Sequence, residues 1–406
     1  MSSPSVVTIE GGITAPNDYL AAAVASGLKP SGLDLALLVS ESVASAAGMF
    51  TTNRAVAAPV VLSQEQLARS GGSAKAIVVN SKCANACTGE EGMSAARAMV
   101  TDTAGALSCK TEHVLVASTG VIGMRLDTNK VRAGIRKAAS MLHSDTHLEA
   151  AKAIMTTDTS PKERAVEVKT SSGTFIIGGM AKGAGMIEPN MATMLGFLTT
   201  DAAVDPALLG RALRTVTNDT FNAITVDGES STNDTVFMLA NGASGVTVTA
   251  DNAIYTALVN GLYSVCSWLA QEIVRGGEGA TKLATIRVTG ATSADDAKRT
   301  ARLIANSPLV KTALNGGDPN WGRVVAVAGR SGVPFDQHKV KVQIGTVTLF
   351  DNATVFPERE SAAAAHLEGT DVEVTIDLGT GGPGTATMWT CDFSAEYVHI
   401  NADYRT

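Results

Sequence analysis

The sequence predicts a layered α/β protein with a smaller, strand-rich domain in its last third. Apolar residues make up 45% of the 406 residues and charged residues 17%, while glycine is abundant and aromatic residues are scarce. This composition is typical of closely packed α/β layers and excludes a disordered chain. Apolar runs alternate with amphipathic stretches in the first part, and extended patterns dominate the end. The length allows two domains of common size.

The first half shows the strand and helix alternation most clearly. Residues 76–80 and 113–117 are short apolar runs bounded by polar or glycine residues, which predicts buried strands. Residues 93–107 and 126–142 carry apolar side chains at three- and four-residue spacing with basic residues opposite, which predicts amphipathic helices.

Extended patterns follow in the middle of the chain, at residues 164–170 and 173–180. A helix is expected near Pro206, and a long helix from about residue 253 to the pair Gly276 and Gly277, where we place the domain boundary. This long helix contains two asparagines, a glycine and a glutamine. We therefore expect a buried helix, not a membrane span.

The last third is predicted to be mostly strand. Apolar or alternating runs predict strands at 285–289, 323–328, 340–350 and 372–378, with one helix at 294–304. The glycine-rich residues 379–385 lack the GxxxxGK[ST] pattern of a phosphate-binding loop, so we expect a tight hairpin there.

Net charge, cysteine content and histidine spacing indicate which binding partners, compartment and cofactors to expect. The net charge is −7 and no basic run occurs, so a small-molecule partner is expected and no nucleic acid. Five cysteines occur without CxxC pairs, which suits a reducing cytoplasm. His143 and His147 lack an evident third ligand, so no metal is predicted, and no motif calls for a cofactor. A thiol nucleophile at Cys83 or Cys87 is disfavoured because neither has a histidine neighbour in the sequence, and we expect both cysteines to be buried as small apolar residues.

The most informative segment is residues 182–197, KGAGMIEPNMATMLGF. Glycines precede a Pro-Asn turn, and an apolar strand begins at Thr193. Taken on its residues alone, this threonine is a β-branched residue at a strand edge.

Several motifs together resemble the ornithine acetyltransferase family, the bifunctional glutamate N-acetyltransferases. They keep the family's order and end with the chain: ASTGVIG at 117–123, MTTDT at 155–159, NMATML at 190–195, VDGESSTNDT at 226–235, GEGATK at 277–282, GDPNWGR at 317–323 and YVHINADYRT at 397–406. One departure is visible at residues 80–88, where Gly-Asn is expected in place of Lys82 and Cys83.

The resemblance implies a self-cleaving N-terminal-nucleophile enzyme. Its scissile bond is Ala192–Thr193, which yields mature chains 1–192 and 193–406. Thr193 then acts as the nucleophile, and its new α-amine, with a reference pKa of about 8, supplies the base that a peptide nitrogen cannot. The family assigns oxyanion stabilisation to Thr119 and Gly120.

By the same resemblance, the enzyme transfers an acetyl group from N-acetylornithine to glutamate through an acetyl-Thr193 intermediate. This reaction belongs to arginine biosynthesis in the cytoplasm. The implied assembly is an α2β2 heterotetramer. Acetyl-CoA stays open as a second donor. Residues 1–280 are expected to form the catalytic α/β domain and 281–406 a strand-rich domain that completes the site. The implied substrate-binding residues are Thr156, Thr157, Lys182, Thr193, Glu278, Asn401 and Thr406; which of Thr156 and Thr157 touches substrate is open.

Two alternatives stay open at this point. An N-terminal-nucleophile amidohydrolase or aminopeptidase uses the same threonine chemistry with water as acceptor. An uncleaved binding protein with an inherited fold is the other; it is expected to have lost Thr193 or the oxyanion residues, and this chain retains both.

Overall fold

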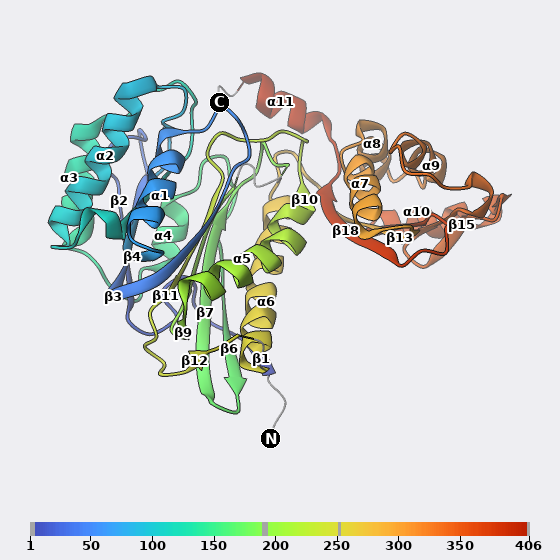
Figure 1. The fold of residues 1–406 in the computed structure, drawn as a ribbon. Coiled ribbons are helices and arrows are strands. Elements are labelled where there is room, and N and C mark those ends of the chain that lie inside the picture. The colour runs from blue at the N-terminus through green and yellow to red at the C-terminus, as the bar shows by residue number, and fades with distance from the viewer. Residues whose placement is uncertain (1–4, 189–193, 251–252, 404–406) are drawn as a thin grey trace. The chain divides into compact units, whose positions relative to one another are not determined.

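The computed structural model describes residues 5–188, 194–250 and 253–403. The chain divides into two compact units, which are described separately (Figure 1). Unit 1 comprises Met1–Asn222 and Glu229–Ile273, and unit 2 comprises Ala223–Gly228 and Val274–Arg405. The predicted layered α/β class is confirmed. The functional division at residue 280 and the mature chains 1–192 and 193–406 stay predictions.

Unit 1 is built on a nine-stranded sheet. The strands follow the order β1 (Ser5–Ile9), β6 (Lys162–Thr170), β7 (Gly173–Lys182), β8 (Leu195–Thr200), β11 (Thr235–Ala240), β3 (Leu35–Phe50), β4 (Ser73–Asn80) and β5 (Val114–Ser118), and β2 (Tyr19–Val24) also pairs with β3. A separate small pair joins β9 (Ala203–Val204) to β12 (Thr247–Val248).

Inner strands such as β4 are buried on both faces, and their side chains alternate between two cores. In β4, Ala76 and Val78 face one core, and Ile77 and Val79 face the other. The first core is closed by α1 (Ala58–Arg69), α2 (Gly89–Ala106) and α3 (Thr128–Ala139), and the second includes α4 (His147–Ala153). Continuous apolar runs at 76–80 and 113–117 therefore form buried strands, β4 inside the sheet and β5 at its edge.

Helices α5 (Pro206–Asp219) and α6 (Ala253–Arg275) cover the other part of the unit 1 sheet (Figure 1). Helix α6 is long and apolar enough to cross a membrane by length and composition, and 44% of its most apolar window is buried. Its fully buried residues include Leu258, Leu262, Val265 and Leu269, which lie at three- and four-residue spacing on one face. That stripe is the pattern of a helix packed on a protein core.

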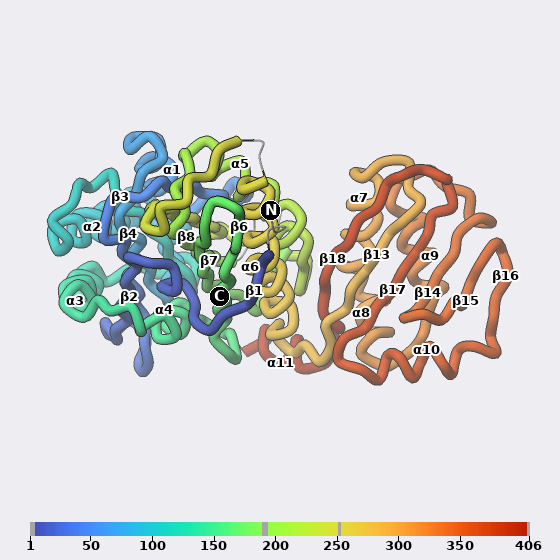
Figure 2. The backbone as a smooth tube through the Cα atoms, turned by 90° about the horizontal axis from the view of Figure 1, so that it is seen from below, coloured from blue at the N-terminus to red at the C-terminus, as the bar shows by residue number. Residues whose placement is uncertain are grey.

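Unit 2 is a seven-stranded sheet with helices (Figure 2). Its strand order is β10 (Ile224–Thr225), β18 (Gly384–Cys391), β13 (Leu283–Ala291), β17 (Asp371–Asp377), β14 (Lys341–Ile344), β15 (Val347–Asp351) and β16 (Thr354–Val355). Its helices are α7 (Ala294–Ala305), α8 (Pro308–Gly316), α9 (Trp321–Gly329), α10 (Glu360–Leu367) and α11 (Ala395–Asp403).

The predicted strand at 323–328 is wrong, because these residues belong to helix α9. The side chain of Asn320 accepts the backbone N–H of Arg323 at 3.1 Å and caps the helix. Val324, Val327 and Ala328 are then buried on one face at helical spacing. The cap and this burial override the β propensity of the valines. The expectation of one helix in the last third is also wrong, since α7 is joined by α8, α9, α10 and α11.

Two connections in unit 2 also differ from expectation. The run 340–350 is two strands, β14 and β15, joined at Gly345 with φ +57°. Residues 379–385 do not form a hairpin between β17 and β18, because β13 lies between those strands in the sheet. A local glycine cluster cannot distinguish a hairpin from a crossover, since both need tight turns.

Candidate active site

In unit 1, the loops that follow the parallel strands β4 and β5 are joined by backbone hydrogen bonds. Strands β4 and β5 are paired in register, with Asn80 opposite Ser118, so the loops after them leave the same sheet edge. The Thr119 N–H donates to the Asn80 carbonyl at 3.0 Å, and the Val121 N–H donates to the Lys82 carbonyl at 2.9 Å. The segment around residue 120 is therefore held by backbone contacts on both sides.

Gly120 sits between those two hydrogen bonds and has φ +129°. A Cβ at this position would lie 2.2 Å from the carbonyl carbon of Lys82 and 2.3 Å from its oxygen. Only glycine permits this approach. Within the described part of the chain, the N–H of Gly120 has no hydrogen-bond acceptor. A fixed, uncommitted N–H is a suitable donor for a developing oxyanion.

A third loop, before β11, is tied to the same place through Asn233. Its side-chain amide donates to the carbonyl of Ala84 at 2.6 Å and to that of Ser118 at 2.9 Å. The side chain is 6% exposed, so these bonds form away from water and hold the three loops in one arrangement.

Lys182 reaches this arrangement from the end of β7. It is 4% exposed, and its ammonium donates to the Thr119 hydroxyl at 3.4 Å. The structure thus brings together two residues that the sequence analysis had assigned to different roles, one to the oxyanion and one to the substrate.

Asp158 organises the surroundings of Lys182. Its carboxylate accepts from the ammonium of Lys162 at 2.7 Å, from the Gly183 N–H at 2.7 Å and from the Thr156 N–H at 3.1 Å. The ammonium of Lys182 lies 4.0 Å away. Burial alone would raise the pKa of Asp158, but Lys182, Lys162 and these hydrogen bonds outweigh it and lower the pKa to about 2.

A small cavity of about 10 Å³ lies where these groups converge. It is lined by Thr119, Lys182, Met194, Leu195, Ser231, Asn233 and Asp234. Met194 is the first described residue after the predicted nucleophile, Thr193.

Glu278 and Asn401 lie together in unit 2. The Asn401 amide donates to the Glu278 carboxylate at 2.9 Å and to the Tyr397 carbonyl at 3.0 Å. The Tyr397 hydroxyl donates to Asp227 at 3.2 Å. Asn401 and Tyr397 are on α11, so this helix positions the amide against the carboxylate.

The remaining predicted residues are placed as follows. Thr156 and Thr157 follow α4, and both are half-buried. Ala192, Thr193 and Thr406 lie outside the described residues, so the assigned cleavage site, nucleophile and C-terminal contact stay predictions.

The departure at Lys82 and Cys83 has a visible backbone consequence. Lys82 has φ +80°, a conformation that glycine adopts more easily, which accounts for the expectation of glycine at this position. Cys83 is buried, and burial raises the pKa of its thiol, whereas Cys87 is exposed. The expectation that both cysteines are buried is therefore wrong for Cys87.

Sequence reasoning missed three residues of the site: Asp158, Lys162 and Asp234. Two of them stand inside motifs that were recognised, at 155–159 and 226–235. The signal available in the sequence was a carboxylate within each motif that had been given no role.

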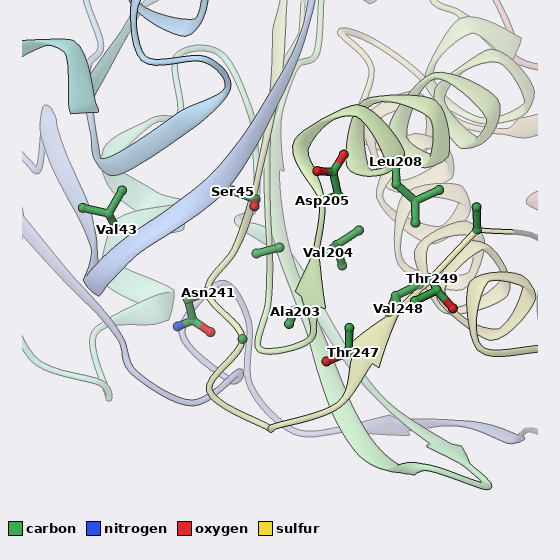
Figure 3. A pocket seen from close by; sticks show the side chains of 13 residues that line it. Val43, Ser45, Ala203, Val204, Asp205, Leu208, Asn241, Thr247, Val248 and Thr249 are labelled. Atoms are coloured by element: carbon green, nitrogen blue, oxygen red, sulfur yellow. The ribbon is translucent and has the colours of Figure 1, made fainter.

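A larger cavity of about 570 Å³ lies elsewhere in unit 1 (Figure 3). Val204, Leu208 and Val248 line it, and it contains none of the predicted site residues. Among the described residues, no group of three or more His, Cys, Asp or Glu side chains is placed to hold a metal ion.

Comparison with known proteins gives matches over nearly the whole chain. The model of the ArgJ family matches residues 20–406. The arginine biosynthesis bifunctional protein ArgJ of Symbiobacterium thermophilum is 48% identical over 402 residues, which cover 98% of this chain and 99% of that protein. The protein of the same name from Dehalococcoides mccartyi is 46% identical over 410 residues and 100% of each chain.

A solved structure, the ornithine acetyltransferase of Mycobacterium tuberculosis complexed with ornithine, is 39% identical. It covers 46% of this chain and 98% of its own, with a TM-score of 0.42.

Proposed function

The chain belongs to the ArgJ family, and we propose that it is a glutamate N-acetyltransferase of arginine biosynthesis. It transfers the acetyl group of N2-acetyl-L-ornithine to L-glutamate. The observation that carries this proposal is the family match over residues 20–406, a range that includes every residue predicted for the site.

Autoproteolysis between Ala192 and Thr193 prepares the enzyme. The cut converts the peptide nitrogen of Thr193 into an α-amine with a reference pKa of about 8, close to the working pH. This amine accepts the proton of the Thr193 hydroxyl, which is otherwise a weak nucleophile.

Acetyl transfer then proceeds in two half-reactions. The Thr193 oxygen bonds to the acetyl carbon of acetylornithine, and the C–N bond breaks as the α-amine passes its proton to the departing amine. Ornithine leaves an acetyl ester on Thr193. The amine of glutamate attacks that ester, and the hydroxyl of Thr193 regains a proton.

Thr119 and Gly120 stabilise the oxyanion that forms in each half-reaction. The rigid loop and the uncommitted N–H of Gly120 support this role, because a donor fixed before the reaction needs no reorganisation. One such donor is worth about 3 kcal/mol of transition-state stabilisation.

Charge supports the assignment of the substrate groups. Lys182 and Lys162 are two buried ammonium groups beside the buried carboxylate of Asp158. The ammonium of Lys182 also contacts the Thr119 hydroxyl, and a cation at this place suits the carboxylate of the substrate. Glu278 accepts the side-chain ammonium of ornithine. Thr156 or Thr157, Asn401 and Thr406 complete the contacts.

The proposal extends to the assembly and the compartment. The chains 1–192 and 193–406 stay associated as an α2β2 heterotetramer in the cytoplasm, where the five free cysteines suit a reducing environment. The chemistry as written uses no cofactor or metal. Because the relatives are named bifunctional, acetyl-CoA is the second donor to assay.

Intact-protein mass spectrometry tests the nucleophile. We expect wild type to give chains of 192 and 214 residues (406 − 192 = 214), Thr193→Ala to stay whole, and Thr174→Ala, an exposed threonine on β7, to be cut like wild type. A single uncut wild-type chain would remove the proposed catalyst.

An acceptor assay tests the transferase. Labelled acetylornithine is incubated with and without glutamate, and acetylglutamate and free acetate are measured. We expect acetylglutamate only with glutamate. Equal consumption without glutamate identifies a hydrolase that uses water as acceptor.

A further inference from the structure

Glu278 is a buried carboxylate that has no cationic partner among the described residues. It is 9% exposed, and the hydrogen bond that it accepts comes from the neutral amide of Asn401, at 2.9 Å. A buried carboxylate is normally paired with a cation, because an unpaired charge away from water is costly. The place of its oxygen atoms therefore decides how well an incoming ammonium group is bound.

The backbone just after Glu278 is held by a second buried carboxylate, that of Asp392. Asp392 is 2% exposed, and one of its oxygens accepts the N–H groups of Thr281 at 2.8 Å and Lys282 at 2.9 Å. Its other oxygen accepts from the Thr281 hydroxyl at 2.6 Å and from the amide of Asn315, on α8, at 2.7 Å. Four hydrogen bonds thus end on one side chain, and three of them come from the segment that follows Glu278.

Strand pairing fixes the place of Asp392 itself. It directly follows β18, whose last residue, Cys391, is paired with Leu283, the first residue of β13. Burial alone would raise the pKa of Asp392, but the hydrogen bonds from Asn315, Thr281 and the backbone outweigh it and lower the pKa. The group is therefore ionised near neutral pH, so both of its oxygens accept hydrogen bonds and neither donates.

Residues 392–401 also hold the other side of the same turn. The Ser394 hydroxyl donates to the Gly279 carbonyl at 2.6 Å. Gly279 has φ +69°, and a Cβ there would lie 2.4 Å from the backbone nitrogen of Tyr397, so the turn lies tightly against the start of α11. Helix α11 in addition supplies the amide that touches the Glu278 carboxylate. One segment therefore restrains both the backbone beside Glu278 and the group that contacts its side chain.

We propose that Asp392 is a positioning residue: through the turn at 279–282 it holds the Glu278 carboxylate where it binds the side-chain ammonium of the acetyl donor. The inference rests on the proposed function, in which Glu278 accepts that ammonium, and it adds the residue that sets the preference for a donor with a cationic side chain. A misplacement of about 1 Å at a binding group can cost about 10²-fold in rate, so restraint of this turn is enough to set the preference.

The test compares two donors that differ in one group. N2-acetyl-L-norleucine has the same number of side-chain heavy atoms as N2-acetyl-L-ornithine, with a methyl group in place of the ammonium. The kcat/KM of each donor is measured with the full chain and with glutamate as acceptor, and the ratio of the two values gives the preference for the cation. Circular dichroism checks the folding of each variant.

Three variants separate positioning from a general loss of stability. Asp392→Ala removes all four hydrogen bonds at once, and Ser394→Ala is a milder change that removes one bond to the turn. Asp201→Ala is the matched control. Asp201 is also buried, at 1% exposed, and it accepts the N–H groups of Ile176 and Asn17 and the side-chain amide of Asn17, but it lies in unit 1.

We expect wild type to prefer acetylornithine. Asp392→Ala should lower the kcat/KM of acetylornithine about 10²-fold, mainly through KM, and leave that of acetylnorleucine unchanged, whereas Asp201→Ala should keep the wild-type ratio. Equal losses for both donors in Asp392→Ala assign a structural role and overturn the inference. The same change of ratio in Asp201→Ala also overturns it.

The remaining outcomes are decisive as well. If Asp392→Ala does not fold, Ser394→Ala carries the test: it should lower the ratio, and a wild-type ratio overturns the inference. If wild type uses both donors equally well, the preference does not exist and the inference fails, while the proposed transferase stands. If wild type forms no acetylglutamate from acetylornithine, the proposed function fails, and the inference fails with it.

Discussion

Two buried carboxyl groups at the candidate site, Asp158 and Asp234, have pKa values shifted in opposite directions. Burial raises the pKa of both. Lys182 and Lys162, with backbone N–H donors, reverse the effect at Asp158, whereas at Asp234 the effect of burial outweighs the Met194 N–H, Lys182 and Thr51. Both groups are buried, so at the scale of single residues it is their neighbours that differ. The neighbours keep Asp158 ionised as a counter-charge, and they leave Asp234 in its neutral, acidic form.

The substitution Asp158→Asn is expected to destabilise the protein strongly. It leaves the buried ammonium groups of Lys162 and Lys182 without their shared counter-charge, which costs about 3–5 kcal/mol in the free energy of unfolding. The measurement is urea unfolding near pH 7. Glu167→Gln is the control, because its partner Lys169 is 59% exposed and such pairs are worth at most about 1 kcal/mol. Equal stabilities of the two variants would contradict the charge-balance role.

The same residue predicts part of the acid sensitivity. Because the pKa of Asp158 is about 2 in the folded state and about 3.9 in the unfolded state, its ionisation contributes about 2 kcal/mol of stability above pH 4. This contribution is lost as pH falls from 4 to 2. Stability curves of wild type and Asp158→Asn should therefore converge at low pH, and parallel curves would count against the assignment.

At the scale of elements, the site depends on loops that leave the ends of β4, β5 and β7 and that precede β11. Parallel pairing of β4 with β5 brings the loops after residues 80 and 118 to one edge, as it does in many α/β sheets. Asn233 then joins the loop before β11 to both of them. The sheet sets where the loops lie, and the loop contacts set the direction of the Gly120 N–H.

The substitution Gly120→Ala is expected to lower acetyl transfer by at least about 10²-fold, because the new Cβ must displace the loop at Lys82 and thereby move the N–H donor. Gly123→Ala is the matched control. Gly123 also has a positive φ, +77°, but a Cβ there meets nothing within 4 Å. The two variants thus share backbone strain and differ in the clash, and kcat/KM of each against wild type separates the two effects. Equal kcat/KM would show that strain alone is responsible.

At the scale of the molecule, the predicted cut falls between adjacent strands of one sheet. Strand β8 is hydrogen-bonded to β7, which belongs to chain 1–192, and to β11, which belongs to chain 193–406. Strand β11 in turn pairs with β3 of the first chain. Segments of the two predicted chains therefore alternate across the sheet, and each covers hydrogen-bonding edges of the other.

The cleaved chains are accordingly expected to remain associated under native conditions, because separation exposes unpaired edges and buried faces of β7, β8, β11 and β3. Size-exclusion chromatography of a preparation tagged on one chain should show both chains in one peak, and 6 M guanidinium should separate them. Separation in native buffer would contradict the predicted position of the cut. The mass of the native peak also tests the α2β2 assembly.

The sequence by itself was sufficient for the family, the α/β class, and elements such as β4, β5 and α6, because motifs and hydrophobic periodicity can be read from residues close together in the chain. It also named Thr119, Gly120 and Lys182 by resemblance. Only the tertiary structure assigned α9, where a cap and burial overrode the propensity of the valines, and the crossover at 379–385, where β13 separates β17 from β18. It alone distinguished Asp158 from Asp234, since a carboxyl group's proton affinity depends on which distant side chains share its buried space.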